Sequence, residues 1–315
     1  MPRRELALEL AANAGLTDIK TYDYDVPMFE DPAIDAVYIA IPTGLHLGAV
    51  IAAAKAKKAI LCEKPMGNNA EEVRAMVQAS KDNNVPLMTD YMARFSDVFQ
   101  KAKEMIQGGD IGQVSFVTTH FSYPCMDPYP PGKPDGWRWT DPAGGGPLLD
   151  IGIYLAFGIR EILGERLAQV TPLNMNTTVP PEAAVPDTTA AVFVTDKGTP
   201  GTLVTTFSHS ALYMTFFGAT GNLIVKDNFY QTSGAVLQLE RNREVVDVLN
   251  TKLDPNLSHC DNYRREFEHF SNALLTNTPH SPSAEDVLAD ALLLDALKKN
   301  ATPIVAPTPA QYLQA

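Results

Sequence analysis

Three side chains that can handle protons stand in two short phrases of the sequence. Lys64 comes after the hydrophobic run 59–62, between a glutamate and a proline. Asp150 and Tyr154 stand four residues apart, in a phrase that opens with three glycines. This spacing places both side chains on one face of a helix, because residues one turn apart are neighbours. A lysine, a carboxylate and a phenol can together move the proton that accompanies hydride transfer at a carbon bearing oxygen.

The first part of the chain alternates between predicted strands and predicted helices. Strands are expected at 35–41, 59–62 and 86–89, and helices at 3–14, 47–57 and 70–84. Such alternation predicts βαβ units, which form a parallel sheet with right-handed crossovers. We therefore expect residues 1–93 to form part of a doubly wound nucleotide-binding domain. Lys64 directly follows a strand of this sheet, and ligands bind beyond the carboxyl ends of such strands.

The second part of the chain, 94–315, is richer in predicted strands. Strands are expected at 114–121, 189–195, 201–209, 212–219, 222–225 and 235–239, and helices at 97–107, 152–163, 262–275 and 283–299. Successive strands at hairpin spacing predict an antiparallel sheet. The sequence thus predicts an α/β fold, in which an incomplete doubly wound, Rossmann-like domain precedes an α+β domain with a large, mostly antiparallel sheet.

Composition and charge exclude some classes of function. The 315 residues carry a formal net charge of −12, which argues against a nucleic-acid partner. No apolar run approaches the roughly 18 to 20 residues of a membrane-spanning helix, and the N-terminus lacks the pattern of a secretory signal. Three cysteines without C-x-x-C spacing and six scattered histidines predict neither a disulfide framework nor a metal site. We expect a cytoplasmic protein that acts on a small molecule.

The two phrases together resemble the Gfo/Idh/MocA family of NAD(P)-dependent oxidoreductases. Tyr154 stands where most of that family has histidine, which is typical of its glucose–fructose oxidoreductase, aldose and dihydrodiol dehydrogenase branch. The resemblance implies hydride transfer between a nicotinamide, of NADP or NAD, and an aldose C1 or a related cyclic polyol. A trans-dihydrodiol or xylose dehydrogenase is the alternative enzyme, and a non-catalytic cofactor-sensing protein or an inactive fragment is the alternative outside catalysis.

The resemblance also implies roles for the three proton-handling residues. Tyr154 would be the acid–base group, and Lys64 would lie beside the nicotinamide and lower the pKa of the phenol. The Lys64–Pro65 bond would be cis, a form accessible at low cost only before proline. Asp150 would bind substrate and catalytic groups, although its position also suits a helix N-cap. The ordinary alternatives are a solvated lysine at a strand end and a core tyrosine.

Further binding positions follow from matching the family's motifs. Cofactor contacts are implied for Ile41, Pro42, Thr43, His46, Glu63, Lys64, Pro65, Arg94, Trp137 and Arg138, and substrate contacts for Lys64, Asp150, Tyr154 and Tyr263. His46 has the alternative role of capping the helix that follows it. The glycines at 144–146 suit either a close approach of the backbone to ligand or a plain turn.

A dinucleotide fold is expected to begin with a strand, a G-x-G-x-x-G turn and a helix, and the sequence contains no G-x-G-x-x-G. Compared with the family, the chain begins at the helix after the second strand. Two interpretations remain, a divergent protein that lost dinucleotide binding and a truncated member of the family, and the intact remainder of the cofactor motifs favours truncation. Because the turn supplies N–H donors to the pyrophosphate, we expect the 315 residues to bind NADP weakly or not at all.

A homodimer or homotetramer is also expected. An antiparallel sheet that helices cover on one side has a second broad face to bury, and two-fold dimers are the commonest solution. The runs 202–204 and 213–217 are more apolar than strands with one face in water usually are.

Overall fold

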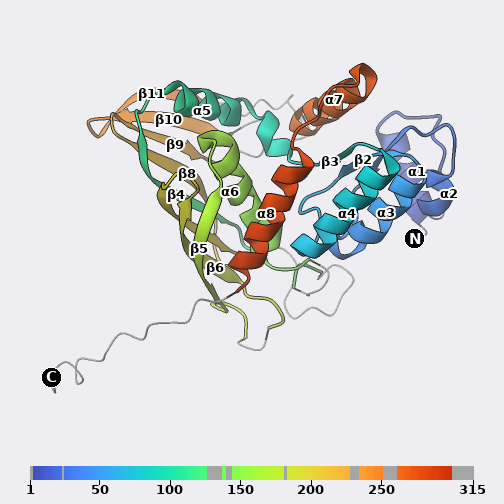
Figure 1. Ribbon diagram of the computed structural model, residues 1–315, viewed down its shortest axis with the longest axis horizontal. Coiled ribbons are helices and arrows are strands. Elements are labelled where there is room, and N and C mark those ends of the chain that lie inside the picture. The colour runs from blue at the N-terminus through green and yellow to red at the C-terminus, as the bar shows by residue number, and fades with distance from the viewer. Residues whose placement is uncertain are drawn as a thin grey trace.

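The computed structural model describes residues 3–22, 25–125, 137–139, 144–180, 183–227, 234–250 and 261–299. Within them the chain forms two sheets that lie at opposite ends of the molecule (Figure 1). The smaller sheet contains β1 (Ala36–Ile39), β2 (Ala59–Cys62) and β3 (Leu87–Thr89), all parallel and in that order. The parallel Rossmann-like arrangement predicted for the first part of the chain is thereby confirmed.

The helices of the first part are α1 (Arg3–Asn13), α2 (Asp25–Phe29), α3 (His46–Lys55) and α4 (Ala70–Asn83). Both faces of β2 are buried, which explains why its sequence is an unbroken apolar run. Val50 and Ala53 of α3 and Met76 of α4 pack with Ile60 in one core. The side chain of Asn69 accepts a hydrogen bond from the Glu72 N–H and so fixes where α4 begins.

The larger sheet has eight strands in the order β11-β10-β9-β8-β4-β7-β6-β5. Their bounds are β4 (Val114–Ser122), β5 (Leu167–Met175), β6 (Thr188–Thr195), β7 (Pro200–Thr206), β8 (Ala211–Gly218), β9 (Asn222–Lys226), β10 (Val236–Arg241) and β11 (Glu244–Asn250). All neighbours are antiparallel except β4 and β7, which pair in parallel. The mostly antiparallel second sheet is therefore also confirmed.

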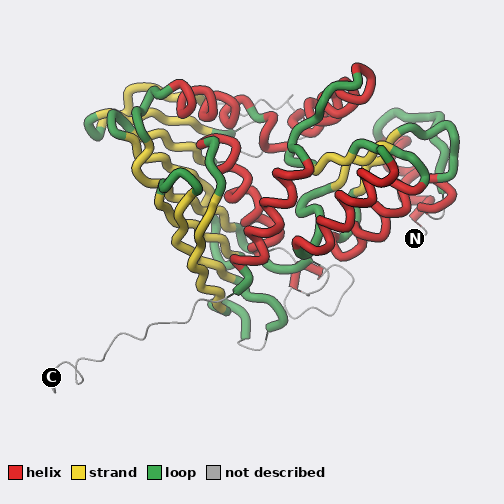
Figure 2. The backbone as a smooth tube through the Cα atoms, in the orientation of Figure 1, coloured by secondary structure: helices red, strands yellow, loops and turns green. Residues whose placement is uncertain are grey.

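Helices pack on one face of the larger sheet (Figure 2). They are α5 (Asp97–Gly108), α6 (Ile153–Gly158) and α8 (Ala284–Leu297), with wide π turns at Leu148–Gly152 and Ile159–Leu163 on either side of α6. Phe99 and Phe157 stack with ring centroids 5.3 Å apart. These two rings lie in the same core as Met214 and Phe216 of β8. No described helix is long and apolar enough to cross a membrane.

The last helices return to the first sheet. Phe270 of α7 (Asp261–Thr276) packs against Leu61 and Met88 of the parallel sheet. Helix α8 joins the two cores, because Val287 packs in the core of the first sheet whereas Leu294 packs in that of the second. The helical tail therefore holds the two sheets together. The start of α8 was predicted correctly, since Ser283 and Asp286 form a capping box there.

Several elements differ from the sequence prediction. Strands β5 and β11 were not predicted, and both lie at the edges of the larger sheet. Pro172 within β5 is compatible with an edge because an edge strand has unpaired backbone positions. The helix predicted at 152–163 is α-helical only at Ile153–Gly158. Gly158 is the last residue of α6, just before the second wide turn, and a Cβ atom there would lie 2.8 Å from the Cε atom of Met214.

The close packing of the larger sheet can be tested at Gly201 of β7. A Cβ atom there would lie 2.2 Å from Cζ of Phe193 and 2.5 Å from the carbonyl oxygen of Val117. Gly201→Ala is therefore expected to lower the free energy of unfolding by about 1–3 kcal/mol. The measurement is urea unfolding followed by circular dichroism.

Gly108→Ala is the matched control, because a Cβ atom at this last residue of α5 would have nothing within 4 Å. This change is expected to leave the stability unchanged or raise it by up to about 1 kcal/mol. Equal stability of the Gly201 variant and the wild type would contradict the packing described for β4, β6 and β7.

Candidate active site

A cavity of about 450 Å³ lies at the carboxyl ends of β1 and β2. Its walls come from both parts of the chain and consist of Ala40, Ile41, Pro42, Thr43, Glu63, Lys64, Arg138, Asp150, Tyr154 and Tyr263. The turn after β1 and the charged pair after β2 form one side, and the wide turn before α6 forms the other. The structure thus brings together most of the residues predicted from the sequence.

Lys64 reaches from the first sheet to the second part of the chain. Its Nζ donates hydrogen bonds to the backbone oxygen of Asp150 at 2.7 Å and to the Oδ1 atom of Asp150 at 3.3 Å. The same Nζ lies 4.9 Å from the centroid of the Tyr154 ring. The side chain of Lys64 is 14% exposed, so the alternative of a solvated lysine is wrong. The Lys64–Pro65 bond is cis, as predicted.

Asp150 accepts hydrogen bonds from three side chains. In addition to Lys64, the Tyr123 hydroxyl donates to Oδ2 at 2.6 Å and the Arg138 Nε donates to the same oxygen at 3.1 Å. Burial opposes ionisation of this carboxyl, but the charge of Lys64, the Tyr123 hydrogen bond and the charge of Arg138 outweigh it. The pKa of Asp150 therefore lies below its usual value. Asp150 is an anion that both cations of the cavity share.

The prediction that Asp150 serves as a helix N-cap is wrong. Asp150 lies inside the wide turn Leu148–Gly152, and its backbone N–H already donates to the Gly146 oxygen at 3.1 Å. The position before this turn is Pro147, and no side-chain cap is made there. The carboxylate is free of the helix backbone and available to the cavity.

Tyr154 is 6% exposed and lies on the cavity wall. Burial raises the pKa of its phenol well above the ordinary value, and Tyr263, Glu63 and the other nearby acids raise it further. The pKa of Tyr154 is therefore raised on balance, whereas the presence of Lys64 alone was expected to lower it. The charge of Lys64 is engaged by Asp150, and its ammonium faces the ring of Tyr154. Tyr154 is consequently a neutral phenol, able to donate its proton.

Glu63 is held at the cavity edge by two donors. Its Oε1 accepts from the Tyr38 hydroxyl at 2.7 Å and its Oε2 accepts from the Lys64 N–H at 3.0 Å. Burial and the nearby Asp90 raise the pKa of Glu63. Glu266 of α7 lies behind these residues, and burial together with the Asp90 carboxyl raises its pKa to about 11. Burial and mutual repulsion thus raise the pKa of both Glu63 and Glu266.

The glycine run at 144–146, in the second part of the chain, lies against the turn after β1. Gly144 has a φ of +90°, and a Cβ atom there would lie 2.5 Å from Cβ of Thr43 and 3.0 Å from Oδ1 of Asn68. Only a residue without a side chain fits this approach. The glycine therefore brings the backbone close to the first part of the chain, and a plain flexible turn does not account for it.

Several predicted cofactor positions do not line the cavity. His46 is buried, with its Nε2 2.7 Å from the Ile41 oxygen and its Nδ1 3.1 Å from the Met66 oxygen, so it joins two loops and makes no helix cap. The guanidinium of Arg94 faces Glu161, with Nε 3.9 Å from Oε2. Pro65 is buried beneath the cavity edge. Trp137 begins a 3-10 turn, Trp137–Trp139, but its side chain lies outside the described residues.

Sequence reasoning missed Tyr123, Asp90 and Glu266, which do not line the cavity but act on the side chains that do. Tyr123 begins a proline-rich loop, and a loop of that composition next to a strand end was a usable signal. Asp90 directly follows β3, where the rule for strand ends also applies. Glu266 carries no such signal, because it is one acid of a charged helix and only packing brings it to Asp90.

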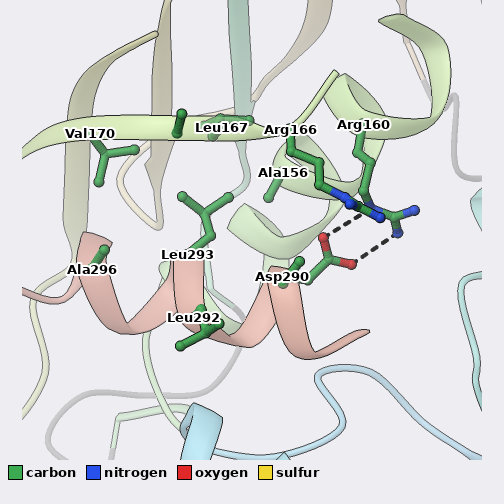
Figure 3. Close-up of a pocket in the computed structure, with 11 residues that line it drawn as sticks. Ala156, Arg160, Arg166, Leu167, Val170, Asp290, Leu292, Leu293 and Ala296 are labelled. Atoms are coloured by element: carbon green, nitrogen blue, oxygen red, sulfur yellow. Dashed lines mark hydrogen bonds and ion pairs between the residues drawn. The ribbon is translucent and has the colours of Figure 1, made fainter. Parts of the chain in front are cut away.

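A second hollow, of about 270 Å³, lies between α8 and β5 (Figure 3). Its walls are mostly apolar, with Leu293 and Val170 among them. At its polar end, Arg160 Nε lies 3.2 Å from Asp290 Oδ1 and Arg160 Nη2 lies 3.1 Å from Asp290 Oδ2. Because these charges satisfy each other, they leave little polar recognition for a ligand, and we place the active site at Lys64.

Comparison with known proteins shows the family to which the chain belongs. The family description "Oxidoreductase family, NAD-binding Rossmann fold" matches residues 2–91, and "GFO/IDH/MocA C-terminal domain" matches residues 99–224. The D-xylose 1-dehydrogenase [NADP(+)] of Haloarcula marismortui is 30% identical over 295 residues, which cover 91% of this chain and 78% of that protein.

Two further proteins are similar to this chain over most of its length. The trans-1,2-dihydrobenzene-1,2-diol dehydrogenase of Mus musculus is 28% identical over 286 residues, covering 89% of this chain and 81% of that protein. A solved structure of levoglucosan dehydrogenase in complex with NADH and levoglucosan superposes with a TM-score of 0.81 at 25% identity, covering 93% of this chain and 84% of that one. The chain belongs to the Gfo/Idh/MocA family of oxidoreductases.

Proposed function

We propose that this protein is an NADP-linked oxidoreductase that transfers a hydride between the nicotinamide and an aldose C1 or a related cyclic polyol. The observation that carries the proposal is the cluster in which Lys64 contacts both Asp150 and the ring of Tyr154 at the end of a parallel sheet. Family membership supports the redox chemistry. The named sugar and diol dehydrogenases among the relatives support the class of substrate.

The proton steps follow from the state of the three residues. In reduction, the neutral phenol of Tyr154 donates its proton to the oxygen of the carbonyl as hydride reaches the carbon. In oxidation, the same phenolic oxygen takes the hydroxyl proton as hydride leaves, and the charge of Lys64 stabilises the phenolate that receives it. Asp150 accepts hydrogen bonds from a substrate hydroxyl and from Lys64 Nζ. The raised pKa of Tyr154 favours oxidation at higher pH, where more phenolate exists.

The residues around the cavity fit the nicotinamide end of the cofactor. NAD(P), when bound, supplies the donor or acceptor of the hydride. Glu63 has a fixed carboxylate at the cavity edge, suited to accept hydrogen bonds from ribose hydroxyls. The backbone of the turn at Ile41, Pro42 and Thr43 forms the neighbouring wall, and Arg138 supplies a cation. The NADP-dependent relative favours NADP over NAD.

The relatives also define which substrates to try first. D-xylose, a trans-dihydrodiol and levoglucosan represent the three chemical types named among them. We further propose a cytoplasmic location, for which the support is two described cysteines, Cys62 and Cys125, that are free thiols. We retain 1–93 and 94–315 as the proposed division into a cofactor domain and a substrate domain.

Removal of the acid–base group tests the proposed mechanism. Tyr154→Phe and Lys64→Ala are each expected to lower kcat by about 10² to 10⁴, because a positioned proton donor or its stabilising charge is lost. The assay follows NADPH formation with the best substrate of the panel. Unchanged circular dichroism verifies that both variants are folded.

Tyr213→Phe is the control, since it removes the same hydroxyl from a tyrosine of β8 that does not line the cavity. Its activity is expected to equal that of the wild type. If Tyr154→Phe kept activity within a few-fold of wild type, Tyr154 could not be the acid–base residue.

We propose in addition that the protein forms a homodimer, or a dimer of dimers, through the open face of the larger sheet. Val192 of β6 and Phe116 of β4 are exposed on this face and line one shallow groove, with Thr171 of β5 beside them. Exposed apolar groups gathered on one face of a sheet are typical of an interface between copies.

Light scattering on a sizing column tests this assembly. The wild type is expected to have at least twice the 34.2 kDa mass of the chain, and Val192→Lys is expected to shift it to the monomer, because Val192 is 56% exposed at the centre of the proposed contact. Leu275→Lys, at a position 84% exposed on α7, is the control and should not change the mass. A monomeric wild type at micromolar concentration would contradict the proposal.

A further inference from the structure

Two carboxyl groups are buried against each other behind the active-site cavity. Asp90 directly follows β3, and Glu266 lies on α7. Each residue is only 1% exposed, and their side chains are in hydrogen-bonding contact with each other. Two ionised carboxylates offer only acceptor atoms, so a hydrogen bond between them needs a proton on one of the two groups.

The surroundings do not supply other donors to this pair. Among the described residues, Asp90 Oδ1, Asp90 Oδ2 and Glu266 Oε2 have no partner in hydrogen-bond geometry, although the Tyr38 hydroxyl and the Met92 N–H approach Asp90. The remaining oxygen, Glu266 Oε1, accepts from the backbone N–H of Tyr91 at 2.8 Å. Because a buried carboxylate without donors is costly, a proton between the two acids would remove both a charge and unsatisfied oxygens.

The charged groups that face the pair favour retention of a proton. Glu63, at the end of β2, adds a third acid, and the Tyr38 hydroxyl donates to Glu63. Lys64 is the cation that faces Asp90, but its Nζ donates to the opposite wall of the cavity. Burial raises the pKa of both acids of the pair, and the contact with Asp90 helps to raise that of Glu266 to about 11.

Helix α7 connects this pair to the cavity. Tyr263 lies three residues before Glu266, so the two side chains occupy neighbouring positions on the helix. Tyr263 lines the cavity and, after burial, is the main cause of the raised pKa of Tyr154. Because Glu266 joins α7 to Asp90 and to the Tyr91 N–H, it fixes this part of the helix beside the end of β3.

We propose that Asp90 and Glu266 share one proton, and that Glu266 is a positioning residue that holds α7 so that Tyr263 contacts the substrate. Glu266 itself touches neither substrate nor cofactor. The role of Tyr263 rests on the proposed function, whereas the shared proton does not. Loss of the proton would leave two adjacent buried carboxylates, which repel each other and weaken the attachment of α7.

Urea unfolding of the full-length chain at several pH values tests the shared proton without substrate or cofactor. The folded chain keeps this proton, and the unfolded chain releases it above the ordinary glutamate pKa of 4.5. The resulting stabilisation is complete below that pKa and is lost as the pH rises toward 11. Glu266→Gln keeps an acceptor for the Tyr91 N–H and a donor for Asp90, but it does not titrate. Relative to this variant, the unfolding equilibrium constant of the wild type should rise about 10-fold for each pH unit.

Glu268→Gln is the matched control, since it makes the same change on the same helix. The side chain of Glu268 is 56% exposed and pairs with Arg264 Nη1 at 2.6 Å. This variant should keep the pH dependence of the wild type. If the wild type and Glu266→Gln have the same pH dependence of unfolding, the two acids hold no proton between them and the proposal is overturned.

Steady-state kinetics of Glu266→Leu test the positioning role. Leucine cannot bond to Asp90 or Tyr91, so KM for the best substrate should rise by about 2- to 10-fold, the value of one hydrogen bond from Tyr263. Glu266→Gln should restore the KM of the wild type, and in a Tyr263→Phe background Glu266→Leu should have no further effect. An unchanged KM for Glu266→Leu, or effects of the two changes that add, would overturn the positioning role. A wild type that turns over no substrate of the panel contradicts the proposed function alone, because unfolding decides the shared proton without substrate.

Discussion

The contact between Lys64 and Asp150 is the interaction on which the site depends. It joins the end of β2 to the wide turn before α6, so it fixes the two parts of the chain on either side of the cavity. Both groups are largely buried, and a buried charge without its partner is costly. Beside this contact, burial and the nearby Tyr263 raise the pKa of the Tyr154 phenol, which is therefore neutral.

The rest of the fold supports this contact from both sides. Gly144 allows the second part of the chain to touch Thr43, and helix α8 joins the two cores at a distance from the cavity. Behind the cavity, burial and the Asp90 carboxyl raise the pKa of Glu266, so ionisation of these neighbouring acids is disfavoured. The site therefore buries several ionisable groups. The interactions among these groups offset part of the cost of burying them, as is common at functional sites.

The sequence predicted the central elements of the fold better than its edges. Buried strands such as β2 carry continuous apolar runs, whereas the edge strands β5 and β11 are mixed in polarity and were missed. In the site, local spacing identified Lys64, Asp150 and Tyr154. Contacts between distant segments were not predictable, and for this reason Glu266 was overlooked and Arg94 was expected at the cavity although it faces Glu161. The predicted pKa of Tyr154 was wrong for the same reason, since burial by distant segments outweighs the lysine.

A double-mutant cycle on Lys64 and Asp150 tests the central claim most directly. The free energy of unfolding is measured in urea for the wild type, Lys64→Met, Asp150→Asn and the double variant, without substrate or cofactor. If the two groups hold each other in the folded chain, their interaction energy should lie between about 0.5 and 3 kcal/mol. Effects that add to within about 0.3–0.5 kcal/mol would show that the two residues act independently. That result would contradict the account of the site.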